Sequence, residues 1–356
     1  IIGKRFRIVH VRFGREIIEV TTFRGPHADE YDDNHSDSGM TLNDNIYGTF
    51  EEDVFRRDFT MNAIYYEPQE EEIIDLANGT ADIENQIIKT IGDPTGRLRE
   101  DPVRMLRATR FQAKLGFGLE SDLQSSIRSL GYLIQDVPPA RLFEEVLKLF
   151  LSGYGTAAFD SMIENDIYGW LFPDSQRSMK SHATEELVRL ALTSTDQRIA
   201  KKMPVTPAFI YAAVLWYPFV EEKKRLEQEE GMTHDAAHEA ANNMISKQQL
   251  FTSIPKRFSG PMRDIWFLQS RLPSRFGQKP DRIMEHKRFR AAYDFLLLRE
   301  QSGEETGRLG EWWTEYQEAT EERKVAMKQS SNNGRPRKRK RKPRRKASTN
   351  DRASLH

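Results

Sequence analysis

The sequence predicts an α+β protein with a mixed α/β region first, a long helical region after it and a basic tail at the end. Three observations support this prediction. Residues 5–13 and 17–23 are rich in β-branched and aromatic side chains and are separated by Gly14-Arg15, which is typical of a β-hairpin. After Gly92-Asp93-Pro94 the residues follow a helical pattern to about residue 325. Residues 335–346 hold ten Lys or Arg among twelve.

Length and composition limit the class of protein. The 356 residues are enough for two or three compact units with separate cores. A hydrophobic fraction of 38% and a charged fraction of 30% suit a soluble, elongated helical protein. The longest apolar stretch, residues 207–220, is shorter than the roughly 20 residues that cross a bilayer, so we expect core helices and no membrane association. The absence of cysteine excludes disulfides and thiolate metal sites and favours a reducing compartment.

Within the N-terminal region, we expect a helix at 58–66, a strand at 73–76 and a turn at Asn78-Gly79. Residues 24–45 are polar, lack periodic hydrophobicity and predict a surface loop. In the second strand of the hairpin, alternation places Glu19 on the same face as Ile17 and Phe23. The end of this mixed region near residue 92 is the predicted domain boundary.

In the helical region, Pro-containing joints follow residues 137, 172 and 254, and the aromatic residues of 311–316 predict a packing helix rather than a base-stacking platform. From Lys324 onward we expect a linker and a disordered tail. The formal net charge is zero, but the chain without residues 335–356 holds 43 basic and 53 acidic residues. The tail is therefore a polycation, which predicts binding to phosphate backbones; a solubility tail and a targeting signal are the alternatives.

Residues 56–63, the first arginine motif, read Arg-Arg-Asp-Phe-Thr-Met-Asn-Ala. With a helix beginning here, Arg56 and Arg57 offer forked donors to a triphosphate, and Asp58 and Asn62, four residues apart, share one face. The alternative is an N-capped amphipathic helix whose arginines only face solvent.

Residues 99–111, the second arginine motif, contain Asp101-Pro102, a favourable helix start. Asp101, Arg104 and Arg107 follow at intervals of one turn and should line a continuous ridge. The alternative is a structural helix with salt bridges. A third segment, residues 141–148, places Arg141 and Glu145 four residues apart, and we expect an intrahelical ion pair that supports the site.

These three segments resemble the RRDFTxNA, EDxxRxxRAxRF and RxxxE motifs of the class II nucleotidyltransferase family, which includes CCA-adding enzymes and bacterial poly(A) polymerases. The resemblance covers about 300 residues. It implies a partial, polymerase-beta-like nucleotidyltransferase head with a mixed β-sheet, followed by a helical neck and body. Gly92-Asp93-Pro94 is similar to the hinge between head and neck.

The resemblance implies that Asp101 and Arg104 select the base of ATP, with Arg107 nearby. The expected nucleotide-binding residues are Arg56, Arg57, Asp58, Asn62, Asp101, Arg104, Arg107 and Arg110. The expected supporting residues are Arg141 and Glu145. The expected domains are the C-terminal part of the head (1–92), the neck that recognises the nucleotide (93–175), the RNA-binding body (176–323) and the polybasic tail (324–356).

Nucleotidyl transfer needs converging carboxylates that hold two Mg²⁺ ions. In the family two of them come from a DxD pair that precedes the first residue of this sequence, so we expect an N-terminally incomplete head and an inactive chain. Asp32 and Asp33 would point apart and do not replace that pair. By resemblance, Glu19 is an auxiliary catalytic carboxylate; the alternative is a surface residue on a strand edge.

Three segments of the helical region resemble the C-terminal body of gamma-proteobacterial poly(A) polymerases: residues 254–257, 262–266 and 289–294. This implies Mg²⁺-dependent, template-independent addition of AMP from ATP to RNA 3′ ends by a cytoplasmic bacterial monomer, with protein partners in RNA decay or processing. The expected RNA-binding residues are Lys256, Arg257, Arg263, Arg271, Arg335, Arg337, Lys338, Arg339, Lys340, Arg341, Lys342, Arg344, Arg345 and Lys346. The alternatives are a CCA-adding enzyme, a non-enzymatic RNA-binding protein and, with the least support, a protein with a nuclear-type basic signal.

Overall fold

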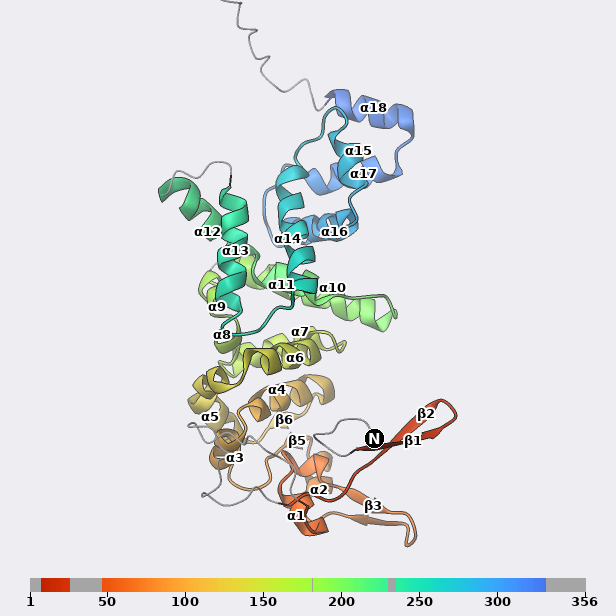
Figure 1. The fold of residues 1–356 in the computed structure, drawn as a ribbon, viewed down its shortest axis with the longest axis vertical. Helices are drawn as coiled ribbons and strands as arrows, with labels where there is room; N and C mark the ends of the chain where they lie inside the picture. The colour runs from red at the N-terminus through yellow and green to blue at the C-terminus, as the bar shows by residue number, and fades with distance from the viewer. Residues whose placement is uncertain (1–7, 26–46, 181, 230–234, 331–356) are drawn as a thin grey trace, which may run out of the picture.

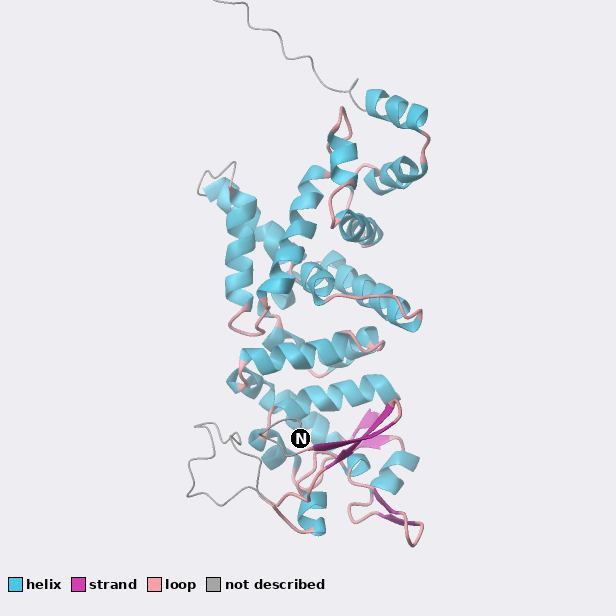
Figure 2. Cartoon of the chain, turned by 45° about the vertical axis from the view of Figure 1, so that its right-hand side comes forward, coloured by secondary structure: helices cyan, strands magenta, loops and turns pink. Residues whose placement is uncertain are grey.

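The structure, a computed structural model, describes residues 8–25, 47–180, 182–229 and 235–330. It is an elongated molecule in which helices are stacked along the long axis in chain order (Figure 1). The strands lie at one end (Figure 2). The α+β class predicted from the sequence is confirmed. Most of the expected surface loop, and the polybasic tail after Ser330, lie outside the described residues.

The strands are short and pair in three two-stranded sheets. The antiparallel pairs are β1 (Val9–Phe13) with β2 (Glu16–Val20), and β3 (Tyr65–Glu67) with β4 (Glu72–Ile74). The parallel pair is β5 (Ile87–Ile88) with β6 (Gly118–Leu119). The predicted hairpin is confirmed, and Gly14 adopts φ +60° at the first position of its two-residue turn, where glycine is favoured.

Helices and helical turns make up most of the remaining described chain. Up to residue 150 they are α1 (Phe50–Phe55), the 3₁₀ turn η1 (Thr60–Asn62), α2 (Gly79–Glu84), α3 (Pro94–Glu100), α4 (Val103–Leu115), α5 (Ser121–Leu130), η2 (Gly131–Asp136) and α6 (Pro139–Phe150). The next are α7 (Gly155–Glu164), α8 (Tyr168–Leu171), α9 (Pro173–Ser178), α10 (His182–Ala200), α11 (Pro207–Val214) and α12 (Trp216–Glu229). The last are α13 (Ala236–Gln248), α14 (Lys256–Arg271), α15 (Lys279–Met284), α16 (Phe289–Gln301), α17 (Leu309–Glu318) and α18 (Glu321–Ser330).

Three of the expected local structures are corrected. The helix expected at 58–66 is wrong, because the helix ends at Phe55 and the motif continues as a 3₁₀ turn and strand β3. Asn78, in the left-handed region, begins α2 rather than a simple turn. Residues 324–330 are not linker, because α18 buries Met327, and Lys328 pairs with Asp281 at 2.9 Å.

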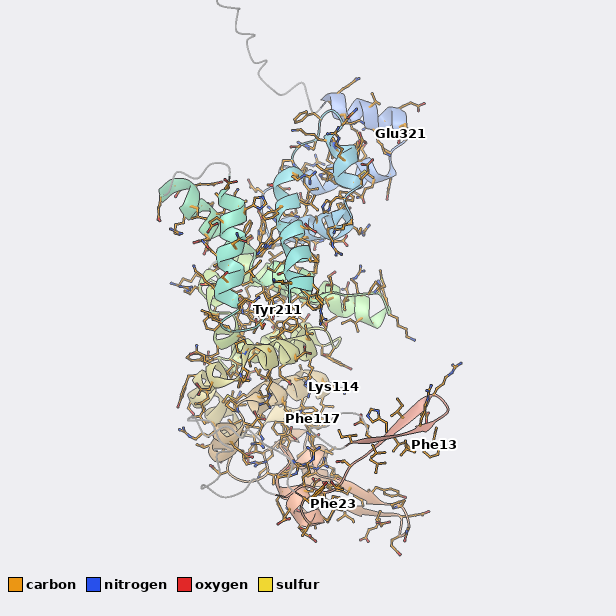
Figure 3. The ribbon with its side chains drawn as sticks, in the orientation of Figure 1. Phe13, Phe23, Lys114, Phe117, Tyr211 and Glu321 are labelled. Atoms are coloured by element: carbon orange, nitrogen blue, oxygen red, sulfur yellow. The ribbon has the colours of Figure 1, made fainter. Side chains whose placement is uncertain are left out.

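The main hydrophobic core runs through the helical layers. Tyr211, fully buried in the body (Figure 3), packs against Phe143 and Phe172 with ring centroids 5.8 Å from each. The same cluster contains Phe59 and Ile88, which precede residue 92. Segment 59–91 is therefore packed directly onto the helices that follow it, and this packing positions the site described below.

A second cluster surrounds Trp313 and Tyr316 of α17. Both side chains are fully buried, and Trp313 Nε1 donates to the carbonyl of Leu272 at 3.1 Å. The expectation that this aromatic helix packs in a core is confirmed.

The β1–β2 hairpin extends away from the helical layers (Figure 1), and every residue of β2 is exposed. Figure 3 shows Phe13 on this hairpin and Phe23 near the base, beside α1. Phe23 contacts Phe50 and Tyr65, with ring centroids 5.4 and 6.4 Å away. This aromatic contact fixes the base of the hairpin next to the first arginine motif.

Candidate functional site

The two arginine motifs meet in one cavity of about 810 Å³, hereafter the motif pocket, between the 53–62 segment, α4 and α6. Seven of the eight expected nucleotide-binding residues line it; Arg110 does not. The two expected supporting residues, Arg141 and Glu145, also line it. Segments far apart in the sequence thus converge as the motifs suggested, although their contacts differ from those expected.

Asp53 is the centre of the first group of contacts. Helix α1, which carries it, begins at Thr49, and Thr49 and Glu52 form a capping box. The Asp53 carboxylate accepts hydrogen bonds from Arg56 Nη2 at 3.0 Å and from Arg57 Nη2 at 3.1 Å. The arginine doublet therefore follows the end of a helix instead of beginning one, and its side chains are held by the last turn of that helix.

Tyr65 completes this group. Its hydroxyl donates to Asp53 Oδ2 at 2.5 Å and accepts from Arg57 Nε at 2.7 Å. Burial alone would raise the pKa of Asp53, but hydrogen bonds from Tyr65, the Arg24 backbone and Arg56 lower it to about 2. Burial, followed by the hydrogen bond to Asp53, raises the pKa of Tyr65 to about 12. Asp53 is thus ionised and Tyr65 neutral at neutral pH.

Asp58 joins the first arginine motif to the second. It accepts from Arg107 Nε at 2.6 Å and from Asn62 Nδ2 at 3.0 Å. Asp58 and Asn62 come together as expected, but Asp58 precedes the 3₁₀ turn that contains Asn62, and the two do not lie on one α-helix. A bond between residues 49 positions apart also fixes α4 against the turn.

Arg97 is a half-buried link that sequence reasoning missed. Its Nη2 donates to the carbonyl oxygens of Arg56 and Arg57, each at 2.6 Å, and its Nη1 pairs with Glu100. Burial and the nearby charge of Arg104 lower the pKa of Arg97. The only local signal was Asp93-Pro94, because Asp93 caps α3 through Gly96 N at 2.7 Å and so orients the helix that carries Arg97.

The continuous ridge expected from Asp101 to Arg107 is wrong. Arg104, whose side chain is 10% exposed, pairs with Glu100 at 2.9 Å and donates to the Arg97 carbonyl at 2.7 Å. Asp101 instead accepts from Arg141 Nη2 at 2.8 Å. The reason is a helix break: Asp101 is extended (φ −144°, ψ 98°) between α3 and α4, so it does not share a helical ridge with Arg104.

The expected ion pair between Arg141 and Glu145 is also wrong. Arg141, in the first turn of α6, reaches across to Asp101, while Glu145 pairs with Lys148 at 2.7 Å. The second carboxylate oxygen of Glu145 is buried and has no hydrogen-bond partner within the described chain. Arg141 therefore connects α6 to the segment between α3 and α4, whereas Glu145 pairs within α6.

Arg110 lies beside the pocket, with its guanidinium carbon 4.7 Å from the centre of the Phe111 ring. Burial, and then the charge of Arg107, lower the pKa of Arg110. The Glu19 side chain is 66% exposed and pairs with His10 Nε2 at 3.2 Å. It does not line the motif pocket, whereas Thr21 of the same chain segment does.

Among the described residues, no group of three His, Cys, Asp or Glu side chains is placed to hold a metal ion. The pocket carboxylates Asp53, Asp58 and Asp101 are each bonded to arginine. They do not fit a two-metal site, and no reaction step through a metal is derived from them.

The charge of the pocket favours an anion. Of the described side chains that line it, seven are cationic and five are anionic. Arginines held by fixed partners keep their planar donor groups oriented, which suits binding of a polyphosphate.

The basic residues expected to bind RNA all belong to α14 where the structure describes them. Lys256, Arg257 and Arg271 are exposed. Arg263 is half-buried, and its Nε has no hydrogen-bond partner in the described part of the chain. No helix of the described residues is both long and apolar enough to cross a membrane.

Three family models match the chain. They are "Poly A polymerase head domain" at residues 1–89, "Probable RNA and SrmB- binding site of polymerase A" at residues 116–179, and "Polymerase A arginine-rich C-terminus" at residues 229–346. Together they span the mixed region, part of the neck and most of the body with its tail.

Similar proteins include the poly(A) polymerase I of Haemophilus influenzae, which is 42% identical over 98% of this chain and 79% of that one. The poly(A) polymerase I of Escherichia coli O157:H7 is 42% identical over 98% of this chain and 77% of that one. A CCA-adding enzyme of Streptococcus pneumoniae is 35% identical over 60% of this chain and 49% of its own length.

Among solved structures, the CCA-adding enzyme of Bacillus stearothermophilus in complex with CTP is similar with a TM-score of 0.46 and 21% identity. The match covers 93% of this chain and 67% of that one. The assignment to a family therefore depends on the sequence comparisons and not on this structural match.

Proposed function

The chain belongs to the bacterial poly(A) polymerase family of nucleotidyltransferases, and from that premise we propose that it adds AMP from ATP to RNA 3′ ends without a template. The RNA 3′ hydroxyl attacks the α-phosphate of ATP, the bond between the α- and β-phosphates breaks, and pyrophosphate leaves. The reaction takes place in the bacterial cytoplasm, and the protein acts as a monomer with protein partners in RNA decay or processing.

One observation carries the proposal for this site: Asp58 and Arg107, from motifs 49 positions apart, are bonded at 2.6 Å in the wall of one cationic pocket. Arg56 and Arg57 have their guanidinium groups held by Asp53, so they are preorganised to bind the triphosphate. Asn62 and Arg107 lie beside them and complete the nucleotide-facing surface.

In the proposed pocket Asp101 selects the base, with Arg141 as the partner that orients its carboxylate. Arg104 acts differently, because its guanidinium is already bonded to Glu100 and to the Arg97 carbonyl. We assign Arg104 the role of a positioning residue that joins α3 to α4. Glu145 and Lys148 support the same wall from α6.

Mg²⁺ dependence, with Glu19 as an auxiliary carboxylate, remains part of the proposal by resemblance alone. The described residues supply no metal cluster, and the chelator in the experiment below tests the dependence on Mg²⁺. RNA binding by the basic residues of α14 and of the tail is proposed on their charge and exposure.

The experiment measures incorporation of labelled ATP and, separately, labelled CTP onto an RNA primer, with Mg²⁺ or with a chelator. Two forms are assayed side by side: the 356-residue chain, and the same chain preceded by the N-terminal segment that the resemblance implies. The comparison also tests the prediction that the 356-residue chain is inactive. Long products made from ATP alone, and only with Mg²⁺, are expected from the longer form.

A CCA-adding enzyme is the second candidate, since one such enzyme is 35% identical over 60% of the chain. Its products would stop after three nucleotides and would need CTP. RNA binding without incorporation by either form would favour the non-enzymatic alternative and contradict the proposal.

A further inference from the structure

A second cavity, of about 230 Å³ and hereafter the body cleft, lies between α10, the segment that leads into α11, and the start of α16. In Figure 1, α10 and α16 lie farther along the long axis than α6, which forms part of the motif pocket. Four cationic side chains line the body cleft: Arg198, Lys287, Arg288 and Arg290. None of them lines the motif pocket or belongs to the basic set expected on α14.

Two of these cations are already engaged. Arg290 Nε pairs with Asp294 at 3.0 Å, and Asp294 is the single carboxylate among the described residues of the lining. Arg198 donates from Nη2 to the carbonyl oxygen of Pro204 at 3.1 Å. Both side chains are therefore held in place and still contribute positive charge to the cleft.

Within residues 8–25, 47–180, 182–229 and 235–330, the side chains of the other two cations have no partner. Within the described chain neither Lys287 nor Arg288 forms an ion pair, and the Nε of Arg288 is shielded from water without a hydrogen-bond acceptor. Unpaired guanidinium donors at a cavity wall leave hydrogen-bonding capacity that an anionic ligand can satisfy.

The neutral part of the lining also suits an oxyanion. Ser194 and Thr206 contribute hydroxyl groups, and Thr206 accepts from Ala208 N at 3.4 Å, which leaves its hydroxyl hydrogen available to donate. The first turn of α16, a 13-residue helix, reaches the cleft through Arg290 and Ala291, so its backbone dipole adds positive potential there.

Size and composition identify the class of ligand. Phe209 is the one aromatic residue in the described lining, and it packs edge-on against Phe295 at 6.0 Å instead of presenting a free ring to a base. The volume is below the range of about 300 to 1,000 Å³ that holds a drug-sized molecule. Cations with hydroxyl donors, and without a stacking platform, are the contacts that proteins make with nucleic-acid phosphates.

The charge of the surrounding chain makes this cluster stand out. Residues 176–323 hold 23 basic and 22 acidic residues, so the body carries almost no net charge, whereas the described lining of the cleft has four cations and one carboxylate. We propose that the body cleft binds a phosphate group of the RNA backbone, at a distance from the motif pocket. The proposal rests on RNA as the substrate and adds a specific backbone contact on the body.

The test is a double variant, Lys287→Gln with Arg288→Gln, and a matched control, Lys201→Gln with Arg282→Gln. The control removes the same charge from exposed positions outside the cleft. Affinity for labelled oligoadenylates of increasing length is measured over a range of salt concentrations, and thermal unfolding checks that both variants fold.

For oligoadenylates long enough to reach the cleft, the double variant should bind about tenfold more weakly at low salt, and its salt slope should fall by about 0.7 for each lost contact. The control should keep the wild-type slope. Arg288→Lys, which retains the charge, should keep most of the affinity. Equal losses in the double variant and the control would overturn the proposal, because the effect would then be general electrostatics.

Inorganic phosphate and pyrophosphate form the second arm. If either one raises the unfolding temperature of the wild type but not of the double variant, while RNA affinity is the same in both, the cleft binds a free anion and the RNA assignment is overturned. Failure of the wild type to bind RNA at all would refute the proposed function as well. RNA binding and AMP incorporation with an unchanged salt slope in the double variant would refute the body cleft alone.

Discussion

Replacing Asp53 with asparagine removes the negative charge around which both arginines of the first motif are arranged. The pKa of Asp53 falls from its ordinary 3.8 to about 2 in the folded protein. Because ionisation of Asp53 is linked to folding, this difference in pKa corresponds to about 2 kcal/mol of stability at neutral pH. Removing one partner of a buried charge group costs about 3 to 5 kcal/mol, because Arg56 and Arg57 then lose their counter-charge. We therefore expect Asp53→Asn to lower the free energy of unfolding by about 2 to 4 kcal/mol at pH 7.

The dependence on pH has a defined sign. Because the folded-state pKa of Asp53 is below the unfolded value, its ionisation stabilises the fold fully above about pH 4, and this contribution disappears as the pH falls towards 2. The difference between wild type and Asp53→Asn should therefore be constant near neutrality and should shrink between pH 4 and pH 2.

Urea unfolding at several pH values measures this difference. Glu51→Gln, an exposed carboxylate on the same helix, is the control and should change stability by less than about 0.5 kcal/mol. Equal stability of the two variants at pH 7, or a difference that stays constant down to pH 2, would refute the reasoning. Weaker ATP binding by Asp53→Asn should accompany the loss, since the arginine doublet is released.

Three further predictions separate the roles of neighbouring residues. In the form extended at its N-terminus, Asp101→Ala should leave the fold intact and relax the preference for ATP over CTP by about tenfold in competing incorporation assays, and unchanged discrimination would remove Asp101 from base selection. Arg104→Gln should instead reduce stability by about 2 kcal/mol in urea unfolding, because Glu100 loses one of its two arginine partners and the Arg97 carbonyl loses a charged donor; a loss within about 0.5 kcal/mol would contradict a positioning role. Deletion of residues 335–346 should weaken RNA binding and lower the salt slope by about 0.7 per lost phosphate contact, and an unchanged slope would show that the tail does not bind RNA.

Several features of the fold could be predicted because their causes are local. The hairpin follows from alternating strand residues around Gly14, and the long helical region follows from hydrophobic periodicity after residue 92. The aromatic helix at 309–318 was correctly predicted to pack in a core. Helix α1 was missed although Thr49 and Glu52 form a capping box, because at six residues it is too short for its periodicity to stand out.

The contacts inside the motif pocket could not be derived in the same way. Spacing of four residues predicted an Arg141–Glu145 pair, yet Arg141 bonds Asp101 and Glu145 bonds Lys148. Sequence spacing identifies only the neighbours on one helix. A charged side chain bonds the partner that is less solvated and better oriented, and that partner can belong to another segment of the chain. Arg97 bonds two backbone carbonyls some 40 residues away, and its local partner Glu100, three residues on, gives no indication of those bonds.

The amino-acid sequence by itself determined the hydrophobic periodicity of the helices and strands, the acidic excess before residue 335 with the basic tail after it, and the motifs that carry the family resemblance. These properties depend on residues that are near one another along the chain. The tertiary structure alone decided which charges are paired and that Asp53 and Arg97 hold the arginine doublet. It also decided that Lys287 and Arg288 form no ion pair with any other described residue of the chain. The physical reason is that the free energy of a charge depends on its burial and on the partners that packing brings to it, and both are set by segments far apart in the sequence.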